Sequence, residues 1–406
     1  GETPEEQKAS WERFTALARA GKVASAWAVE NGLAEAVFKM SLGNEIGFAA
    51  EKTARDWFAP MPGAIVAELT EEVSDAVRIG ATTAEKTISL GSDEASISEL
   101  LALNDAVLES VYPTKTQDTG RVESLSYEAQ ERVAPAIKLA RPKALIPVFP
   151  GTNCDYDTAK AFRTAGARVE MSVLCNIAGD DILRSIAEMK QHIRRAHIFV
   201  LSGGFSAGDE PDGSAKFIVN VLNNADIREE IHALLDRGGL ILGICNGFQA
   251  LVKSGLLPYG RLGMVTKDSP TLFRNDINRH ISQIVSTRVA TTSSPWLAGF
   301  KPGEIHSIAV SHGEGKFVVS EELARELFAN GQVAFQYVDA EGNPTAEAPY
   351  NPNGSSYAIE GILSPDGRIL GKMGHTERYE RNLFKNIAGN KEQSLFRNAV
   401  DYFRKK

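Results

Sequence analysis

The sequence predicts an α/β protein in two parts. A doubly wound, mostly parallel sheet is expected over residues 143–406, preceded by a smaller α+β domain at residues 1–112. From residue 143 to residue 254, short and continuously apolar runs alternate with helical segments, which is typical of a parallel sheet covered by helices on both faces. Beyond residue 280 the apolar runs follow one another closely and predict further strands. Residues 113–142, with Pro, Gly and mixed charges, are predicted to be a linker.

The elements of the first part follow from periodicity. Trp11, Phe14 and Leu17 recur at helical spacing, and the apolar positions of residues 23–41 predict a second helix. Ser96 or Ser98 is predicted to cap a final helix that ends at Leu108. Strands are predicted at 46–50, 64–69, 76–79 and 86–90.

The second part begins with alternating elements and ends with strands. Its predicted parallel strands are 143–149, 169–174, 197–201 and 240–244, separated or followed by helices at 155–165, 182–196, 217–237 and 246–254. Later strands are predicted at 280–290, 307–310, 333–338, 357–363 and 368–373. The turn Ser364–Gly367 is predicted to join the last two as a hairpin.

Composition excludes several classes of protein. Of 406 residues, 43% are hydrophobic and 24% are charged, as in ordinary globular proteins. Lys and Arg number 44 against 52 Asp and Glu, and the net charge of −8 does not suit a nucleic-acid backbone. No apolar run is long enough for a membrane span, and no signal peptide opens the chain. Three scattered cysteines form neither a disulfide framework nor a zinc pair. We expect a cytoplasmic protein with no nucleic-acid, membrane or metal partner.

The sharpest local signal is Gly-Ile-Cys-Asn-Gly at residues 243–247, between a buried strand and a helix. Small residues around Cys245 permit the tight turn of a nucleophile elbow. The sulfur would then lie over the first turn of the helix, where the N–H groups favour a thiolate. The N–H of Asn246 would point at a developing oxyanion. The alternative is that Cys245 is only a buried small hydrophobic residue, which is what we expect for Cys154 and Cys175.

A thiolate nucleophile needs a base and a group that orients the base. His375 and Glu377 follow the last predicted strand, and residues two apart in an extended chain share a face, so Glu377 is expected to accept from the ring of His375. The Gly-rich segment 202–209 follows another strand, where α/β folds place ligands, and Gly204 is expected to be a second oxyanion donor. A solvated loop and an ordinary turn are the alternatives for these two segments. Spacing alone supports a thiol acyl-transfer site.

Five segments resemble one known family. GGFSAGD, GICNGFQALVKSG and GHTER, in that order, resemble the class I (triad) glutamine amidotransferases, and more narrowly the glutaminases of the phosphoribosylformylglycinamidine synthase family. Residues 148–155 and 312–317 resemble that family's opening loop and its internal H-G-E-G-[RK]-F motif. Residues 32–48 resemble the C-terminal half-domain of the ATP-dependent synthetase in the large, fused form, although that family has a Gly-Gly pair where this chain has Asn31-Gly32. The resemblance implies the C-terminal segment of a longer polypeptide.

The resemblance also implies roles. Cys245 would attack the side-chain amide of glutamine, with His375 as base and then acid, oriented by Glu377. The N–H groups of Gly204 and Asn246 would hold the oxyanion. Substrate contacts are implied for Phe205, Gln249 and His312.

The resemblance implies cofactors and partners as well. The glutaminase step would need no cofactor, whereas the complete enzyme would use ATP and Mg²⁺ at a site largely outside this chain. The ammonia would pass to missing N-terminal synthetase domains.

Two rival interpretations stay open. One is an elbow-cysteine peptidase or glyoxalase-type hydrolase, and the other is a catalytically idle binding or regulatory module. Five further histidines lack partner spacing and are predicted to be surface or core residues: His192, His197, His232, His280 and His306.

Overall fold

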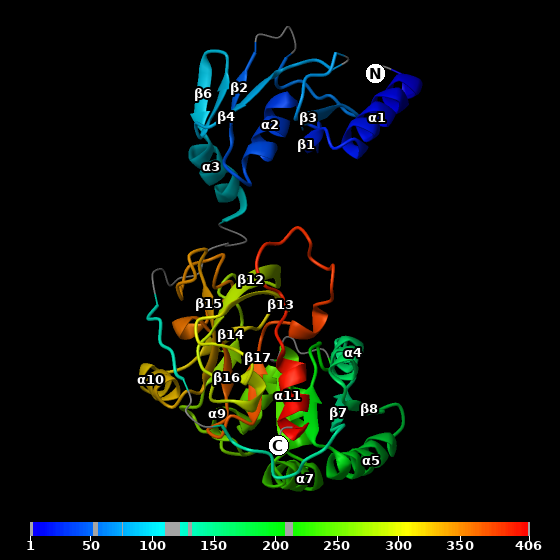
Figure 1. The fold of residues 1–406 in the computed structure, drawn as a ribbon, viewed down its shortest axis with the longest axis vertical. Coiled ribbons are helices and arrows are strands. Elements are labelled where there is room, and N and C mark those ends of the chain that lie inside the picture. The colour runs from blue at the N-terminus through cyan, green and yellow to red at the C-terminus, as the bar shows by residue number, and fades with distance from the viewer. Residues whose placement is uncertain are drawn as a thin grey trace. The chain divides into compact units, whose positions relative to one another are not determined.

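The computed structural model describes residues 3–51, 56–74, 76–109, 122–128, 132–207 and 214–404. The chain divides into two compact units, Gly1–Val111 (unit 1) and Tyr112–Lys406 (unit 2). Figure 1 draws unit 1 in blue to cyan and unit 2 in green to red. The stretches 113–121 and 129–131 of the predicted linker lie outside the described residues.

Unit 1 opens with helix α1 (Pro4–Arg19) and a two-stranded sheet. A capping box starts α1, because Thr3 Oγ1 accepts from the N–H of Glu6 while the Glu6 carboxylate accepts from that of Thr3. The helix predicted over 23–41 is wrong in its first half, which is strand β1 (Val23–Ala28). Its small residues carry little periodicity of their own, and antiparallel pairing with β3 (Ile65–Leu69) decides the conformation. Only the second half is helical, as α2 (Leu33–Ser41).

A four-stranded sheet and a last helix complete unit 1. The sheet order is β4 (Gly80–Thr83), β2 (Gly47–Ala50), β5 (Thr87–Leu90) and β6 (Asp93–Ser96). The strand predicted at 76–79 is therefore wrong, since β4 begins at Gly80. Helix α3 (Ile97–Glu109) is capped by Ser96, whose Oγ accepts from the N–H of Glu99 at 3.1 Å. Two small buried clusters, around Leu33 and Phe48, form the core.

Unit 2 is built on a nine-stranded sheet with the order β13-β12-β15-β16-β17-β10-β9-β7-β8. The strands β8, β7, β9, β10 and β17 are mutually parallel, and the four others join antiparallel, so seven of the nine point in one direction. The predicted mostly parallel α/β fold is confirmed. The strands are β7 (Lys143–Val148), β8 (Arg168–Val173), β9 (Ile198–Leu201), β10 (Leu240–Ile244), β12 (Ile281–Val289), β13 (Ile305–His312), β15 (Val333–Val338), β16 (Ile359–Leu363) and β17 (Ile369–Lys372). A separate pair is β11 (Thr271–Phe273) and β14 (Lys316–Val318).

Helices cover both faces of this sheet. The crossovers β7–α4–β8 and β8–α5–β9 run in opposite directions along the sheet, and right-handed connections then place α4 and α5 on opposite faces. Helix α11 packs on α4, whereas α7 packs on α5 (Figure 1). The single helix predicted over 217–237 is two helices that meet at Asn223-Asn224. The helices are α4 (Asp155–Ala165), α5 (Asp181–Arg195), α6 (Lys216–Leu222), α7 (Ala225–Asp236), α8 (Asn246–Ser254), α9 (Leu256–Tyr259), α10 (Glu321–Ala329) and α11 (Leu395–Arg404), with 3₁₀ turns η1 (Pro295–Leu297), η2 (Ser356–Ala358) and η3 (Thr376–Arg378).

The sheet brings the end of the distant strand β13 beside the end of β10. β13 is five strands away in sheet order, yet the carbonyl of Ser311 at its end lies 3.6 Å from the sulfur of Cys245. The antiparallel half therefore curls over the carboxyl ends of β10 and β17, as expected of a strongly twisted sheet. The described parts of 113–142 lie along unit 2; for example, the N–H of Tyr127 donates to the carbonyl of Ala290. No helix among the described residues is long and apolar enough to cross a membrane.

Candidate active site

Cys245 occupies the turn between β10 and α8. Its φ of 51° and ψ of −106° are rare for a residue with a side chain and cost on the order of 1–3 kcal/mol. Two glycines allow this turn: a Cβ on Gly247 would lie 1.9 Å from the carbonyl oxygen of Leu201, and one on Gly243 would lie 2.7 Å from Gly247. The N–H of Cys245 donates to the carbonyl of Lys372 at 2.8 Å. The side chain is 5% exposed and lies at the carboxyl edge of the sheet.

His375 and Glu377 form a buried hydrogen-bonded pair after β17. Nδ1 of His375 lies 2.6 Å from Oε1 of Glu377. The expected extended backbone is wrong, because β17 ends at Lys372 and Glu377 lies in the 3₁₀ turn η3. The two side chains meet through this turn instead. The N–H of His375 donates to the carbonyl of Ala309 at 2.8 Å, which ties the turn to β13.

Opposing effects set the protonation of this pair. Burial acts to lower the pKa of His375, but the charges of Glu377 and of the Cys245 sulfur outweigh it and raise that pKa well above its usual value. Burial acts to raise the pKa of Glu377, and the charge of His375 brings it below the usual value. An imidazolium beside a carboxylate is therefore favoured.

Gly203 marks the point where the distant segments meet. A Cβ on Gly203 would lie 2.8 Å from Cε1 of His375, 3.2 Å from the sulfur of Cys154 and 3.5 Å from Cβ of Cys245. Cys245 and His375 are thus neighbours on one side of the sheet. Since Nδ1 of His375 is engaged by Glu377, Nε2 is the nitrogen that is left for the Cys245 sulfur. It has no hydrogen-bond partner within the part of the chain that the structure describes.

Gly204 and Asn246 each directly follow a residue of this cluster, Gly203 and Cys245. Gly204 has a φ of 147° and pairs with Thr152 in an antiparallel bridge, which holds the loop after β9 against the loop after β7. Asn246 is the first residue of α8, and the first N–H groups of a helix point out of its end. Its Oδ1 accepts from the N–H of Ser206 at 3.4 Å. Gly208 and Asp209 of the predicted loop lie outside the described residues.

Phe205 and His280 stand at the rim. Phe205 is 49% exposed, and its ring lies 6.0 Å from that of His280. Nε2 of His280 is 3.0 Å from Oγ of Ser311, whose carbonyl faces the Cys245 sulfur. The sequence predicted Phe205 here but treated His280 as an ordinary surface or core residue. No spacing signal links His280 to the site, because it arrives by the curl of the sheet.

Gln249 and His312 are both buried near the nucleophile. Oε1 of Gln249 accepts from Nδ2 of Asn246 at 2.9 Å, and its Nε2 donates to the carbonyl of Glu314 at 2.5 Å. Neither ring nitrogen of His312 has a hydrogen-bond partner among the described residues. The pKa of His312 is lowered to about 3, mainly by burial and further by the charges of His375 and His280. His312 is therefore neutral at physiological pH.

Cys154 is a site residue that the sequence did not predict. Its sulfur lies 3.8 Å from Nδ1 of His375 and accepts from the guanidinium of Arg378 at 3.2 Å. One ligand atom each from Cys154, His375 and Glu377 lies within 4.8 Å of the others, a spacing that could hold a metal ion. His375 and Glu377 already bond to each other through Nδ1 and Oε1, and the adjacent Arg378 adds a positive charge that disfavours a cation. The sequence did not place this thiol here because the segment around Cys154 lacks the flanking glycines that mark Cys245 as a nucleophile.

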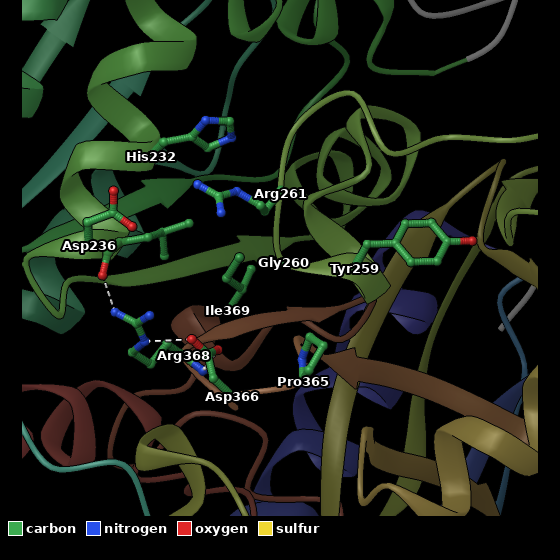
Figure 2. Close-up of a pocket in the computed structure, with 10 residues that line it drawn as sticks. His232, Asp236, Tyr259, Gly260, Arg261, Pro365, Asp366, Arg368 and Ile369 are labelled. Atoms are coloured by element: carbon green, nitrogen blue, oxygen red, sulfur yellow. Dashed lines mark hydrogen bonds and ion pairs between the residues drawn. The ribbon is translucent and has the colours of Figure 1, made fainter.

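A surface hollow of about 220 Å³ lies at the opposite end of the parallel strands. Figure 2 shows His232, Asp236 and Arg261 on one side of it and Asp366 and Arg368 on the other. The guanidinium of Arg368 is bound by Asp366 at 2.7 Å and by the carbonyl of Leu235. Ile369 starts β17, whereas His375 follows its end, so this hollow is separate from the cysteine site.

Known proteins resemble unit 2 over most of its length. The model of the CobB/CobQ-like glutamine amidotransferase domain matches residues 141–403. The phosphoribosylformylglycinamidine synthase subunit PurQ of Methanococcus maripaludis is 33% identical over 282 residues, which cover 65% of this chain and 98% of that subunit. The subunit of the same name from Chlorobaculum tepidum is 34% identical over 252 residues, covering 62% and 94%. The solved structure of PurLQS from Thermotoga maritima is 26% identical and covers 64% of this chain and 99% of that one, with a TM-score of 0.47.

Proposed function

We propose a catalytic mechanism for this protein. The chain belongs to the CobB/CobQ-like glutamine amidotransferase family and is a glutamine amidotransferase of phosphoribosylformylglycinamidine synthase. In this proposal Cys245 is the nucleophile, His375 the base and then the acid, and Glu377 the group that orients the imidazole. One observation carries the assignment: Cys245 and His375 both pack around Gly203, while Glu377 holds the other ring nitrogen at 2.6 Å. Neighbouring sulfur, imidazole and carboxylate groups are what thiol acyl transfer requires.

The proposed reaction proceeds in two half-reactions. His375 accepts the thiol proton of Cys245, and the sulfur attacks the side-chain carbonyl carbon of glutamine. His375 then gives the proton to the leaving nitrogen, so that ammonia departs and a γ-glutamyl thioester remains. Water attacks the thioester, His375 takes a proton from it, and glutamate leaves as the thiol is restored. The raised pKa of His375 favours the imidazolium that this sequence needs beside the sulfur.

The oxyanion of each tetrahedral intermediate is assigned to the N–H groups of Gly204 and Asn246. Gly204 directly follows Gly203, which packs against Cys245, and Asn246 directly follows Cys245 at the start of α8. Positioned N–H donors of this kind are worth about 10²–10³ in turnover each. The assignment rests on placement at the end of the sheet and on the family resemblance.

Substrate contacts are assigned to Phe205, Gln249 and His312. Phe205 offers an exposed ring at the rim, and neutral His312 offers a donor and an acceptor without protein partners among the described residues. The amide of Gln249 is bonded to Asn246 and to the carbonyl of Glu314. Its contribution to glutamine binding therefore acts by fixing those two segments.

The ammonia is proposed to serve a synthetase. The PurQ relatives are subunits of phosphoribosylformylglycinamidine synthase, and unit 1 carries the synthetase-like segment 32–48. ATP and Mg²⁺ would act at the synthetase site of the complete enzyme, which we propose lies largely outside this chain. Among the described residues, no cluster of three or more His, Cys, Asp or Glu ligands lies in unit 1, so we derive no step through either cofactor in this chain.

Release of glutamate from glutamine by the full chain tests the proposal. We expect turnover that is abolished by Cys245→Ser and unaffected by Cys175→Ser, since Cys175 is exposed and no imidazole bonds to its thiol among the described residues. Circular dichroism of both variants should match the parent chain. Peptide or glyoxal turnover without glutamate release would support the rival hydrolases instead.

A further inference from the structure

Two opposite charges are buried directly under the turn that carries His375. Lys372 ends β17, Glu360 lies on the neighbouring antiparallel strand β16, and both are 0% exposed. Nζ of Lys372 lies 3.4 Å from Oε1 of Glu360 and 5.3 Å from the ring centre of Phe335. A buried ion pair loses so much hydration that it is often no more stabilising than apolar residues of the same size. Stability alone is therefore a weak explanation for this pair.

The hydrogen bonds of the pair go to the two residues that flank His375. Nζ of Lys372 donates to the carbonyl of Gly374 at 2.9 Å and to Oγ1 of Thr376 at 3.0 Å. Oε1 of Glu360 accepts from the N–H of Gly374 at 2.6 Å. His375 is thus held on both sides by side chains that do not touch its ring. Oγ1 of Thr376 in turn donates to Gln393 at 2.6 Å, which anchors the far side of the turn.

Gly374 has no side chain, and this leaves room for the Lys372–Glu360 pair. A Cβ at this position would lie 2.8 Å from Oε1 of Glu360, 3.0 Å from Nζ of Lys372 and 2.7 Å from Cγ2 of Ile308. Glycine gives the backbone before His375 more freedom than any other residue would. The bonds from Lys372 and Glu360 restrain this backbone, in addition to the bonds that His375 itself makes to Ala309 and Glu377.

Lys372 also connects the base to the nucleophile. Its carbonyl accepts from the N–H of Cys245 at 2.8 Å, and its ammonium holds the residues around His375. One residue therefore fixes both partners of the reaction relative to β17. A displacement of about 1 Å between such partners can cost about 100-fold in rate.

We propose that the buried Lys372–Glu360 pair is a positioning device that sets the His375 imidazole against the Cys245 sulfur. The inference rests on the proposed glutaminase function and adds a requirement to it. Neither residue is a catalytic residue in this account, because both act through Gly374 and Thr376.

The test compares variants of the full chain. Lys372→Met removes both bonds from Nζ and leaves the Glu360 carboxyl group buried without its cation, so stability and kcat should both fall. The double variant Lys372→Met with Glu360→Gln removes both charges of this pair, and its melting temperature should recover. Its kcat should stay about 10- to 100-fold low, with KM for glutamine within about twofold of the parent value. Lys143→Met is the matched control, since Lys143 pairs with Glu170 at 2.9 Å at the amino end of β7, away from the site.

A second measurement does not depend on turnover. The alkylation rate of Cys245 by iodoacetamide should fall in His375→Ala, and the double variant should reproduce most of that fall. If the double variant regains kcat and alkylation rate together with its melting temperature, the pair is only structural and the inference is overturned. If the parent chain releases no glutamate while the alkylation rates still follow His375→Ala, the inference holds and the proposed function fails.

Discussion

Gly247→Ala tests how tightly the elbow is built. The added Cβ would lie 1.9 Å from the carbonyl oxygen of Leu201 and 2.6 Å from its carbonyl carbon. Carbon and oxygen atoms in contact lie about 3.3 Å apart, so the start of α8 must retreat from β9 by roughly 1.4 Å. Both clashing atoms are main chain, and no side-chain rotation relieves the contact. The retreat displaces Cys245 relative to His375, which follows β17.

The expected cost follows from that displacement. Overpacking of this kind costs about 1–3 kcal/mol of unfolding free energy, and misplacement by about 1 Å costs about 100-fold in kcat. Denaturant unfolding and glutamate release would measure the two effects. Gly179→Ala is the control, because nothing lies within 4 Å of its added Cβ. Parent-like kcat and stability in Gly247→Ala would refute the steric account of the elbow.

Four further predictions concern the buried imidazoles. His375→Ala should lower kcat by about 10²–10⁴-fold, as measured by glutamate release, whereas an unchanged rate would remove it from the mechanism. Glu377→Gln removes the carboxylate that raises the pKa of His375, so NMR titration of the ring should show a lower pKa; an unchanged pKa would contradict the pairing. The pKa of His375 in the folded protein is raised above the unfolded value of 6.5. The protonated ring should therefore add fully to the free energy of unfolding below pH 6.5, and this contribution should disappear as the pH rises through the folded pKa. Unfolding measured at several pH values should show this pH dependence in the parent chain and not in His375→Ala. His312→Phe should raise KM for glutamine by about tenfold with a smaller effect on kcat, the cost of one lost hydrogen bond, and steady-state kinetics with an unchanged KM would exclude the contact.

The elements that carry the nucleophile were predictable from local pattern. β10 and α8 have the predicted bounds, because a buried parallel strand is continuously apolar and glycines mark the turn that follows it. The prediction of a helix over residues 23–28 was wrong for the opposite reason. Small residues there show no clear helical or strand period, and pairing with β3 determines their conformation. The division of 217–237 at Asn223-Asn224 was missed because Asn224 caps a second helix through its side chain.

The surroundings of the site were not predictable in the same way. In the sequence, Lys372 is a single polar residue within an apolar strand. No neighbouring residue in the sequence indicates that its charge is buried against Glu360. Cys154 and His280 reach the site from other strands, brought there by the parallel order of β7 and β9 and by the curl of the sheet. Such proximity depends on tertiary topology, which residue spacing does not encode.

The most direct test of the central claim is labelling of the full chain with the glutamine-mimicking electrophile diazo-oxo-norleucine, followed by peptide mapping. The account predicts one adduct, on Cys245, that is lost in Cys245→Ser and slowed strongly in His375→Ala. Equal labelling of Cys154 or Cys175, or labelling of Cys245 at the same rate without His375, would contradict it.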